Sequence, residues 1–164
     1  MAQYSRKEFE AKVRLGENLE NVDLSNLDLR NAKLRGANLS KSKLTSVRLS
    51  GADLRQTNLS KADMAWANLD RANLEGADLT ETILYDSSLQ EADLSNANLT
   101  RVDLGEANLT KANLTGANLR EAELSQANLT DANLYEADVS GANIDQASTT
   151  KSAVDLRAAT RPDG

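Results

Sequence analysis

The chain of 164 residues contains no cysteine and no histidine. The absence of cysteine excludes a disulfide framework and thiol chemistry. The absence of histidine removes the commonest metal ligand and the commonest acid–base group near neutral pH. The N-terminal residues MAQYSRKEFE are polar, without the apolar core of a signal peptide, and no apolar run nears membrane-spanning length. We therefore expect a soluble, cytoplasmic protein without membrane contact.

Large apolar side chains are few, but they are regularly spaced. Leucine, isoleucine, valine and phenylalanine number 35, about 21% of the chain, which is close to the range of disordered sequences. Counting in fives from Leu19 to Ile144 gives 26 consecutive positions without an insertion, of which 23 are leucine. Alanine stands two residues before 17 of these positions, and asparagine or aspartate stands one residue before 20 of them. The chain is therefore a repeat of five residues over most of its length.

A period of five matches neither the 3.6 of a helix nor the two of a continuous strand. Within one unit the alanine and the leucine are two residues apart, so in an extended segment both point to one side. The next alanine follows the leucine by three residues, which reverses the alternation and requires a corner. Five of the eight glycines occupy the second corner position, where a positive φ is useful: Gly36, Gly51, Gly76, Gly116 and Gly141. This pattern predicts a coil that buries the leucines.

Units such as ADLSN, ANLTK, ANLTG and ANLRE resemble those of the pentapeptide-repeat family, of the A(D/N)LXX type that is abundant in cyanobacteria. The resemblance covers about residues 17–146. It implies an all-β fold, a right-handed quadrilateral parallel β-helix with four pentapeptides per coil. The hand agrees with the general preference of parallel β crossovers. The 26 units then make about six and a half coils, which form a rod of about 30 Å at the spacing of parallel strands.

The ends of a β-helix expose unpaired backbone and need caps. Residues 1–16 are predicted to be such a capping segment with a short helix. Ser5 and Glu8 form a capping-box pattern, Tyr4 and Phe9 stand at the hydrophobic-staple positions, and a glycine at position 16 is a helix stop. The β-helix is then expected over residues 17–146.

Residues 147–164 form a C-terminal cap or tail in this division of the chain. The stretch SAVDLRAAT within it is a possible second helix, with Ser152 as its N-cap and Pro162 beyond its end.

The 25 acidic residues arise from the repeat, since aspartate and asparagine alternate at one outward position. We interpret them mainly as a solvated surface, although clustered carboxylates leave open a calcium-binding or enzyme-accessory surface. The sequence shows no phosphate-binding loop, nucleophile motif or dinucleotide fingerprint. We therefore expect a protein that is not an enzyme and has no cofactor or catalytic metal.

Charge divides the predicted rod along its axis. Residues 29–61 have a net charge of +7 and residues 62–147 a net charge of −12. The family offers a precedent, since some pentapeptide-repeat proteins bind type II topoisomerases such as gyrase by imitating DNA. The acidic part carries one charge per ~1.7 Å, close to the axial charge density of duplex DNA. The alternative is sequence drift on a solvated surface.

Three features count against the DNA-mimic hypothesis. The first coils have the wrong sign of charge, and phenylalanine, which is frequent among topoisomerase-binding members, is absent from the repeat. Those members also commonly dimerise through an aromatic C-terminal end, and the end of this chain has no such surface. A monomer is therefore expected rather than a dimer.

The decapeptide ETILYDSSLQ, residues 81–90, breaks the repeat. Thr82 and Ser87 replace the expected alanines, and Ile83 and Ser88 replace the expected asparagine or aspartate. Deviations from a local rule are found preferentially at functional sites. The competing interpretation is that a β-helix accepts occasional apolar residues outside, and hydroxyls inside when they bond to the backbone.

Stacking every twentieth residue sorts the units onto four faces. One of them, which we call the acidic face, carries one base and seven acids, while the other three are nearly neutral. Its units are centred on Leu24, Leu44, Met64, Leu84, Leu104, Leu124 and Ile144. Three side chains, which we call the apolar patch, are predicted to point outward from adjacent coils of this face: Trp66, Ile83 and Tyr85. Ala65 is expected to point outward beside them.

Acidic residues surround this patch. They include Asp63, Asp86, Asp103 and Glu106, with Glu123 further on. An apolar patch rimmed by polar groups is a usual mark of a contact surface. The leading hypothesis is therefore a non-enzymatic scaffold that presents the acidic face and its patch to an unknown protein partner, without direct binding of nucleic acid. A topoisomerase-binding DNA mimic and a calcium-binding or enzyme-accessory surface are the alternatives.

Overall fold

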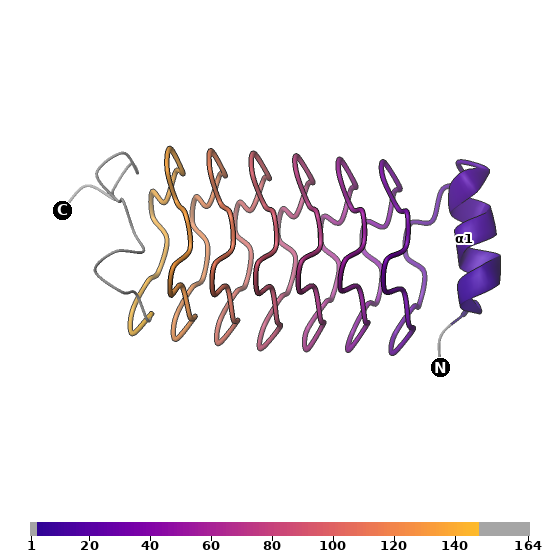
Figure 1. Ribbon diagram of the computed structural model, residues 1–164, viewed down its shortest axis with the longest axis horizontal. Coiled ribbons are helices and arrows are strands. Elements are labelled where there is room, and N and C mark those ends of the chain that lie inside the picture. The colour runs from indigo at the N-terminus through magenta and orange to yellow at the C-terminus, as the bar shows by residue number, and fades with distance from the viewer. Residues whose placement is uncertain (1–2, 148–164) are drawn as a thin grey trace.

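The computed structural model describes residues 3–147 and shows a rod of stacked coils with one helix at its N-terminal end (Figure 1). The predicted second helix, with Ser152 as its N-cap, lies outside the described residues. No helix in the described part of the chain is long and apolar enough to cross a bilayer.

The helix α1 (Arg6–Arg14) lies across the first coil. Its start is the predicted capping box, because Ser5 Oγ accepts a hydrogen bond from the Glu8 N–H and the Glu8 carboxylate accepts one from the Ser5 N–H at 2.8 Å. Hydrogen bonding to Ser5 lowers the pKa of Glu8. Gly16 follows the helix with a φ of +67° and ends it.

The side of α1 that faces the rod is apolar. Phe9 is fully buried and joins the leucine core, and Tyr4 and Val13 pack against that core. Two further contacts tie this segment to the backbone of the first coils. The Gln3 N–H donates to the Asp23 carbonyl at 2.6 Å, and the Arg6 guanidinium donates to the carbonyl of Arg30 at 3.0 Å. The helix therefore covers the first coil, as the capping pattern predicts.

The coils pair through isolated parallel bridges rather than long strands. All 21 bridges among the described residues join positions 20 apart, from Asp23↔Lys43 to Glu123↔Asn143. With a corner every five residues, this register makes four sides per coil, as predicted. On one side, for example, the Leu44 N–H donates to the Asp63 carbonyl at 2.7 Å, and the Asp63 N–H donates to the Ser42 carbonyl at 2.9 Å.

From Leu24 onward, each described corner is a β-turn closed by a backbone hydrogen bond, such as that from the Ala67 N–H to the Met64 carbonyl at 3.1 Å. At the first corner the Val22 N–H donates to Ser42 Oγ at 3.1 Å instead. Only the second corner residue has a positive φ, which identifies a type II turn. The five glycines predicted for this position have φ between +64° and +71°. The remaining corners place 21 residues other than glycine in the same left-handed region, with φ from 50° to 63°. The backbone ladder thus imposes a conformation that most of these residues do not prefer.

The leucines and alanines of the repeat fill the interior. Leu84 and Met64 are fully buried, as are nearly all of the other positions counted in fives. The two hydroxyls that replace alanine in the broken decapeptide are also buried and bond to the backbone. Thr82 Oγ1 donates to the Leu59 carbonyl at 2.8 Å, and Ser87 Oγ donates to the Leu84 carbonyl at 2.6 Å. The inward half of the break is therefore accommodated by the fold.

Two residues differ in burial from what their positions in the repeat suggest. Ile144 occupies an inward position but is 48% exposed, because it lies on the last described coil and no further described coil covers it. Ala65 was expected to point outward, yet it is only 7% exposed. Its methyl group lies at the first corner position between the larger side chains of Thr45 and Tyr85, which stand 20 residues before and after it.

Candidate protein-interaction face

Outward positions on three neighbouring coils of the acidic face form an array of three rows. The rows are Asp63, Ala65 and Trp66; Ile83, Tyr85 and Asp86; and Asp103, Gly105 and Glu106. The bridges Asp63↔Ile83 and Ile83↔Asp103 align the first column. The other columns follow from the same 20-residue register, so neighbouring rows lie ~4.8 Å apart. The coil therefore brings together all seven of the side chains predicted for the site.

The three residues of the apolar patch are exposed. Trp66 is 57% exposed, Ile83 is 42% exposed and Tyr85 is 36% exposed. Leu15 and Tyr135 are also exposed, but neither belongs to the acidic face, and the exposed Ile144 lies on the last described coil of that face, away from the patch. The outward direction predicted for the patch is thus confirmed, while its contact with a partner stays a prediction.

Trp66 adopts a backbone conformation that disfavours a bulky side chain. Its φ is 58°, in the left-handed region. A non-glycine residue there costs roughly 1–2 kcal/mol, and asparagine is among the few that tolerate it. Because most of the indole is exposed, its burial does little to offset this cost. Folding therefore gives no reason for a tryptophan at this corner.

Tyr85 is held in place by its neighbours on the next coil. Its hydroxyl donates a hydrogen bond to Glu106 Oε1 at 2.5 Å. Its ring lies over Gly105, where an added Cβ would stand 3.2 Å from Tyr85 Cδ2. The hydrogen bond to Glu106 raises the pKa of Tyr85, and desolvation and nearby acids raise it further. Gly105 was not predicted to belong to the site, although a glycine 20 residues after an outward tyrosine is a visible signal.

The acids around the patch fall into two kinds. Asp63 and Asp103 are partly buried, and each accepts a hydrogen bond from the backbone N–H two residues later, at 3.2 and 3.0 Å. They therefore support the corners as well as adding charge. Asp86 and Glu106 occupy second corner positions and are exposed, which leaves the Asp86 side chain open to a ligand.

The acidic face differs from the other faces in its ion pairs. On the other three faces, eight ion pairs of 4.0 Å or less join basic and acidic side chains of the described coils. Among the described residues of the acidic face there is none, although seven acids lie there. Its single base, Lys43, makes no ion pair within the described rod. Apart from the attraction between Lys43 and Asp23, the negative charge of this face is therefore uncompensated.

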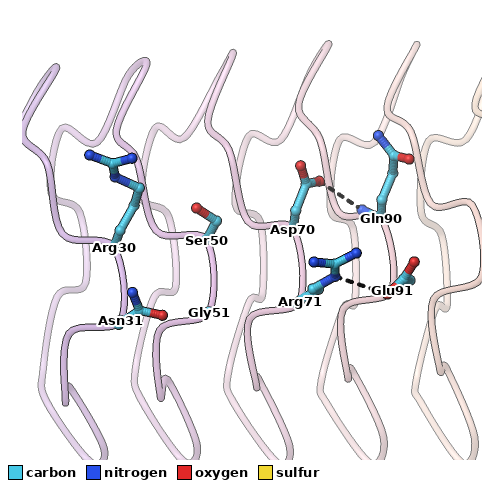
Figure 2. Close-up of a pocket in the computed structure, with 8 residues that line it drawn as sticks. All are labelled: Arg30, Asn31, Ser50, Gly51, Asp70, Arg71, Gln90 and Glu91. Carbon is cyan, nitrogen blue, oxygen red and sulfur yellow. Dashed lines mark hydrogen bonds and ion pairs between the residues drawn. The ribbon is translucent and has the colours of Figure 1, made fainter.

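A separate hollow of about 440 Å³ lies along a corner of the rod. It is lined by Arg30, Asn31, Ser50, Gly51, Asp70, Arg71, Gln90 and Glu91. Figure 2 shows Arg71 directed toward Glu91, with which it forms an ion pair at 2.9 Å. The guanidinium of Arg30 is likewise paired with Asp28 at 2.6 Å. Both guanidinium groups that line the hollow, those of Arg30 and Arg71, already have acidic partners.

The described residues contain no group of three or more acidic side chains arranged to hold a metal ion. In the same part of the chain, every buried side-chain nitrogen and oxygen has a hydrogen-bond partner. The features that distinguish the acidic face are therefore its exposed apolar patch and its unpaired carboxylates.

The fold and this surface define a solenoid of five-residue units with an outer face available for contacts. Comparison with known families then identifies it: the chain belongs to the pentapeptide repeat family, whose model, described as pentapeptide repeats, matches in eight copies over residues 18–51, 48–86, 87–126 and 112–148. Members of this family form right-handed β-helices, as the sequence predicts. Comparison with proteins of curated function finds no match.

Solved structures of cyanobacterial pentapeptide repeat proteins are similar to this chain. HetL from Nostoc sp. strain PCC 7120, a protein involved in heterocyst differentiation regulation, is 32% identical over 85% of this chain and 64% of its own, with a TM-score of 0.54. Rfr23 from Cyanothece 51142 is 39% identical over 55% of this chain and 61% of its own, with a TM-score of 0.54. The chain thus spans less than two thirds of the length of either relative.

A structure of lower sequence identity has a similar fold. A trypsin-treated form of QnrB1, a plasmid-mediated fluoroquinolone resistance protein, is 17% identical over 90% of this chain and 85% of its own, with a TM-score of 0.57. At this identity the likeness shows the fold alone.

Proposed function

We propose that this protein is a non-enzymatic interaction scaffold that binds a protein partner through the apolar patch and the acids around it. The observation that carries the proposal is Trp66, which is 57% exposed at a φ of 58°. Twenty other residues that are not glycine share this left-handed φ, but Trp66 combines it with a large apolar side chain that is poorly buried, so a role outside folding accounts for it. Family membership supports the proposal, since pentapeptide repeat proteins are generally structural or interaction proteins.

The rigidity of the patch favours binding. Tyr85 is fixed by Glu106 and by its contact over Gly105, so it loses little freedom when a partner binds. Rigid exposed aromatics often contribute most of the energy of an interface. Three side chains are few beside the ~800 Å² that each partner contributes to a standard interface. The contact is therefore weak, or it extends onto Asp63, Asp86, Asp103 and Glu106.

A repeat-restoring variant tests this function with little risk to the fold. Trp66→Asn, Ile83→Asn and Tyr85→Thr together return the patch to residue types that other units carry at the same positions. We expect wild type to retain a specific partner from a lysate of the source organism. The triple variant should bind that partner more weakly by about 2 kcal/mol or more.

Tyr135→Thr is the matched control, because it removes an exposed tyrosine at a first corner position of another face. We expect it to bind the partner as wild type does. Equal retention of the partner by wild type and by the triple variant would show that the patch has no role.

The DNA-mimic alternative rests on the net charge of −12 over residues 62–147. That sum already counts Arg71 and Arg101, which pair with Glu91 and Glu121 outside the acidic face. The six acids of the acidic face in this range have no ionic partner among the described residues, and acids on the other faces, such as Glu75 and Asp93, add to the charge around the rod. A gyrase supercoiling assay tests this alternative, and salt-sensitive inhibition at micromolar protein would favour it. Calorimetry with calcium tests the calcium-binding alternative.

A further inference from the structure

The exposed indole of Trp66 has an exposed carboxylate beside it. Asp86 stands in the same corner column one coil further on. The backbone N–H of Trp66 donates to the carbonyl of Tyr85, the residue before Asp86, at 3.0 Å. The two corner residues are thus ~4.8 Å apart along the rod. Neither side chain forms an ion pair or a hydrogen bond with another described side chain. An aromatic face and an unpaired negative charge are therefore available together.

A second copy of this chain does not suit this surface. In a two-fold dimer through the acidic face, the same patch from each copy would meet the other. The uncompensated carboxylates of both copies, including Asp63 and Glu106, would then surround one interface. Like charges brought together in this way oppose association, and no base of the described acidic face other than Lys43 is present to offset them.

We propose that Trp66 and Asp86 form a subsite for an arginine side chain of the partner, so that the partner is a basic protein segment with apolar residues beside its arginine. This inference rests on the proposed function and names the chemistry of its partner. A guanidinium stacks on an indole through its planar face and also forms paired hydrogen bonds to a carboxylate. Ile83 and Tyr85 then contact the apolar neighbours of the arginine.

Arginine satisfies both halves of this subsite better than lysine. The lysine ammonium is a compact, strongly hydrated point charge that neither stacks nor forms a two-pronged contact. Charge attraction alone would treat the two residues alike. Discrimination between them therefore separates a built subsite from general attraction to an acidic surface.

The test uses the full chain and a blocked nonapeptide in which arginine alternates with leucine. Matched peptides carry lysine or neutral citrulline in place of arginine. Trp66 is the only tryptophan, so its indole N–H resonance and its emission report on this subsite directly. We expect the arginine peptide to shift both signals and to bind about two- to fivefold more tightly than the lysine peptide. The citrulline peptide should have little effect.

Asp86→Asn tests the carboxylate, since asparagine suits the φ of 50° at this corner and leaves the fold intact. We expect it to weaken the arginine peptide about two- to fivefold. Glu136→Gln, at a second corner position of another face, is the matched control and should have no effect.

Equal binding of the arginine and lysine peptides overturns the subsite, and so does unchanged binding by Asp86→Asn. An absence of any shift in the Trp66 signals at millimolar peptide overturns it as well. Each of these results leaves the proposed function standing if the repeat-restoring variant still loses the lysate partner. If that variant retains the partner, the proposed function fails whatever the peptides do.

Discussion

The ring of Tyr85 lies over Gly105 on the next coil, with Tyr85 Cδ2 3.2 Å from the position that a Cβ on residue 105 would occupy. The same tyrosine donates its hydroxyl to Glu106, the residue that follows this glycine. The absence of a side chain at Gly105 and the carboxylate of Glu106 thus fix the orientation of Tyr85, the central residue of the apolar patch. The two residues are 20 apart in the sequence, so only the four-sided coil brings them into contact.

Gly105→Ala should disturb Tyr85 rather than the fold. The φ of Gly105 lies outside the left-handed region, so alanine fits the backbone and the stability change should stay within about 1 kcal/mol. The new methyl group would stand 3.2 Å from both Asp103 Oδ1 and Tyr85 Cδ2, so it displaces the tyrosine ring as well as the Asp103 carboxylate and weakens the bond of Tyr85 to Glu106. Spectrophotometric titration should then find a lower Tyr85 pKa than in wild type.

Gly36→Ala is the matched control for this change. Gly36 has a φ of +71° with no atom within 4 Å of an added Cβ. In this variant, the backbone strain of an alanine at a positive φ should lower the stability of the protein by roughly 1–2 kcal/mol, without an effect on Tyr85. An unaltered Tyr85 pKa in Gly105→Ala would contradict the packing described above.

The titration of Tyr85 should affect stability at alkaline pH. The hydrogen bond to Glu106 raises its pKa in the folded state above the ordinary value of 10.0. The stability from this bond is therefore fully present below pH 10, and it is lost as the pH rises through the folded pKa. Chemical denaturation of wild type should show this loss above pH 10, and Tyr85→Phe should lack it.

Glu106→Gln tests directly why the pKa of Tyr85 is raised. Removing the carboxylate should bring the Tyr85 pKa down toward its ordinary value, because the hydrogen bond to Glu106 is the main cause of its rise. A Tyr85 pKa that stays unchanged in this variant would assign the shift to desolvation instead.

Phe9→Ala should destabilise the protein strongly. The Phe9 ring is fully buried between α1 and the first coil, and truncation of a buried phenylalanine costs about 3–5 kcal/mol. Loss of the helix contact also uncovers the end of the first coil, so size-exclusion chromatography should detect larger species. Leu15→Ala is the control, since Leu15 is 76% exposed and its change should stay within about 0.5 kcal/mol.

Trp66→Asn should leave the protein as stable as wild type, or raise its stability by up to about 1 kcal/mol. Asparagine accepts the left-handed conformation more readily than tryptophan, and little buried area is lost. Thermal and chemical denaturation measure the difference. A loss of more than about 1 kcal/mol would mean that the indole is a packing residue, and it would remove the main support for the proposed function.

The sequence by itself determined the fold of this protein. Leucine at every fifth position from Leu19 and alanine two residues earlier leave one arrangement that buries both, a coil with a corner in each unit. The register between coils also follows from the sequence, because no insertion interrupts the count of 26 units. The capping box of Ser5 and Glu8 is likewise a short-range signal, so α1 could be predicted from a few residues.

The outward direction of Trp66, Ile83 and Tyr85 also followed from the count in fives. The exposure of each side chain did not, since it depends on the size of the residues on the coils before and after it. Ala65 shows this: its position points outward, but the residues 20 before and after it leave it 7% exposed. Ile144 shows the reverse, since it occupies an inward position on the last described coil and is 48% exposed.

Only the tertiary structure decided which charges are paired and which side chains are held. Whether an acid meets a base depends on reach between coils, and the structure pairs Arg71 with Glu91 while it leaves Asp86 without an ionic partner among the described residues. The contact of Tyr85 with Gly105 arises in the same way. The repeat fixes the position of each residue on its coil through local geometry. The contacts between neighbouring coils join residues about 20 apart in the sequence, and they depend on the size and charge of both side chains.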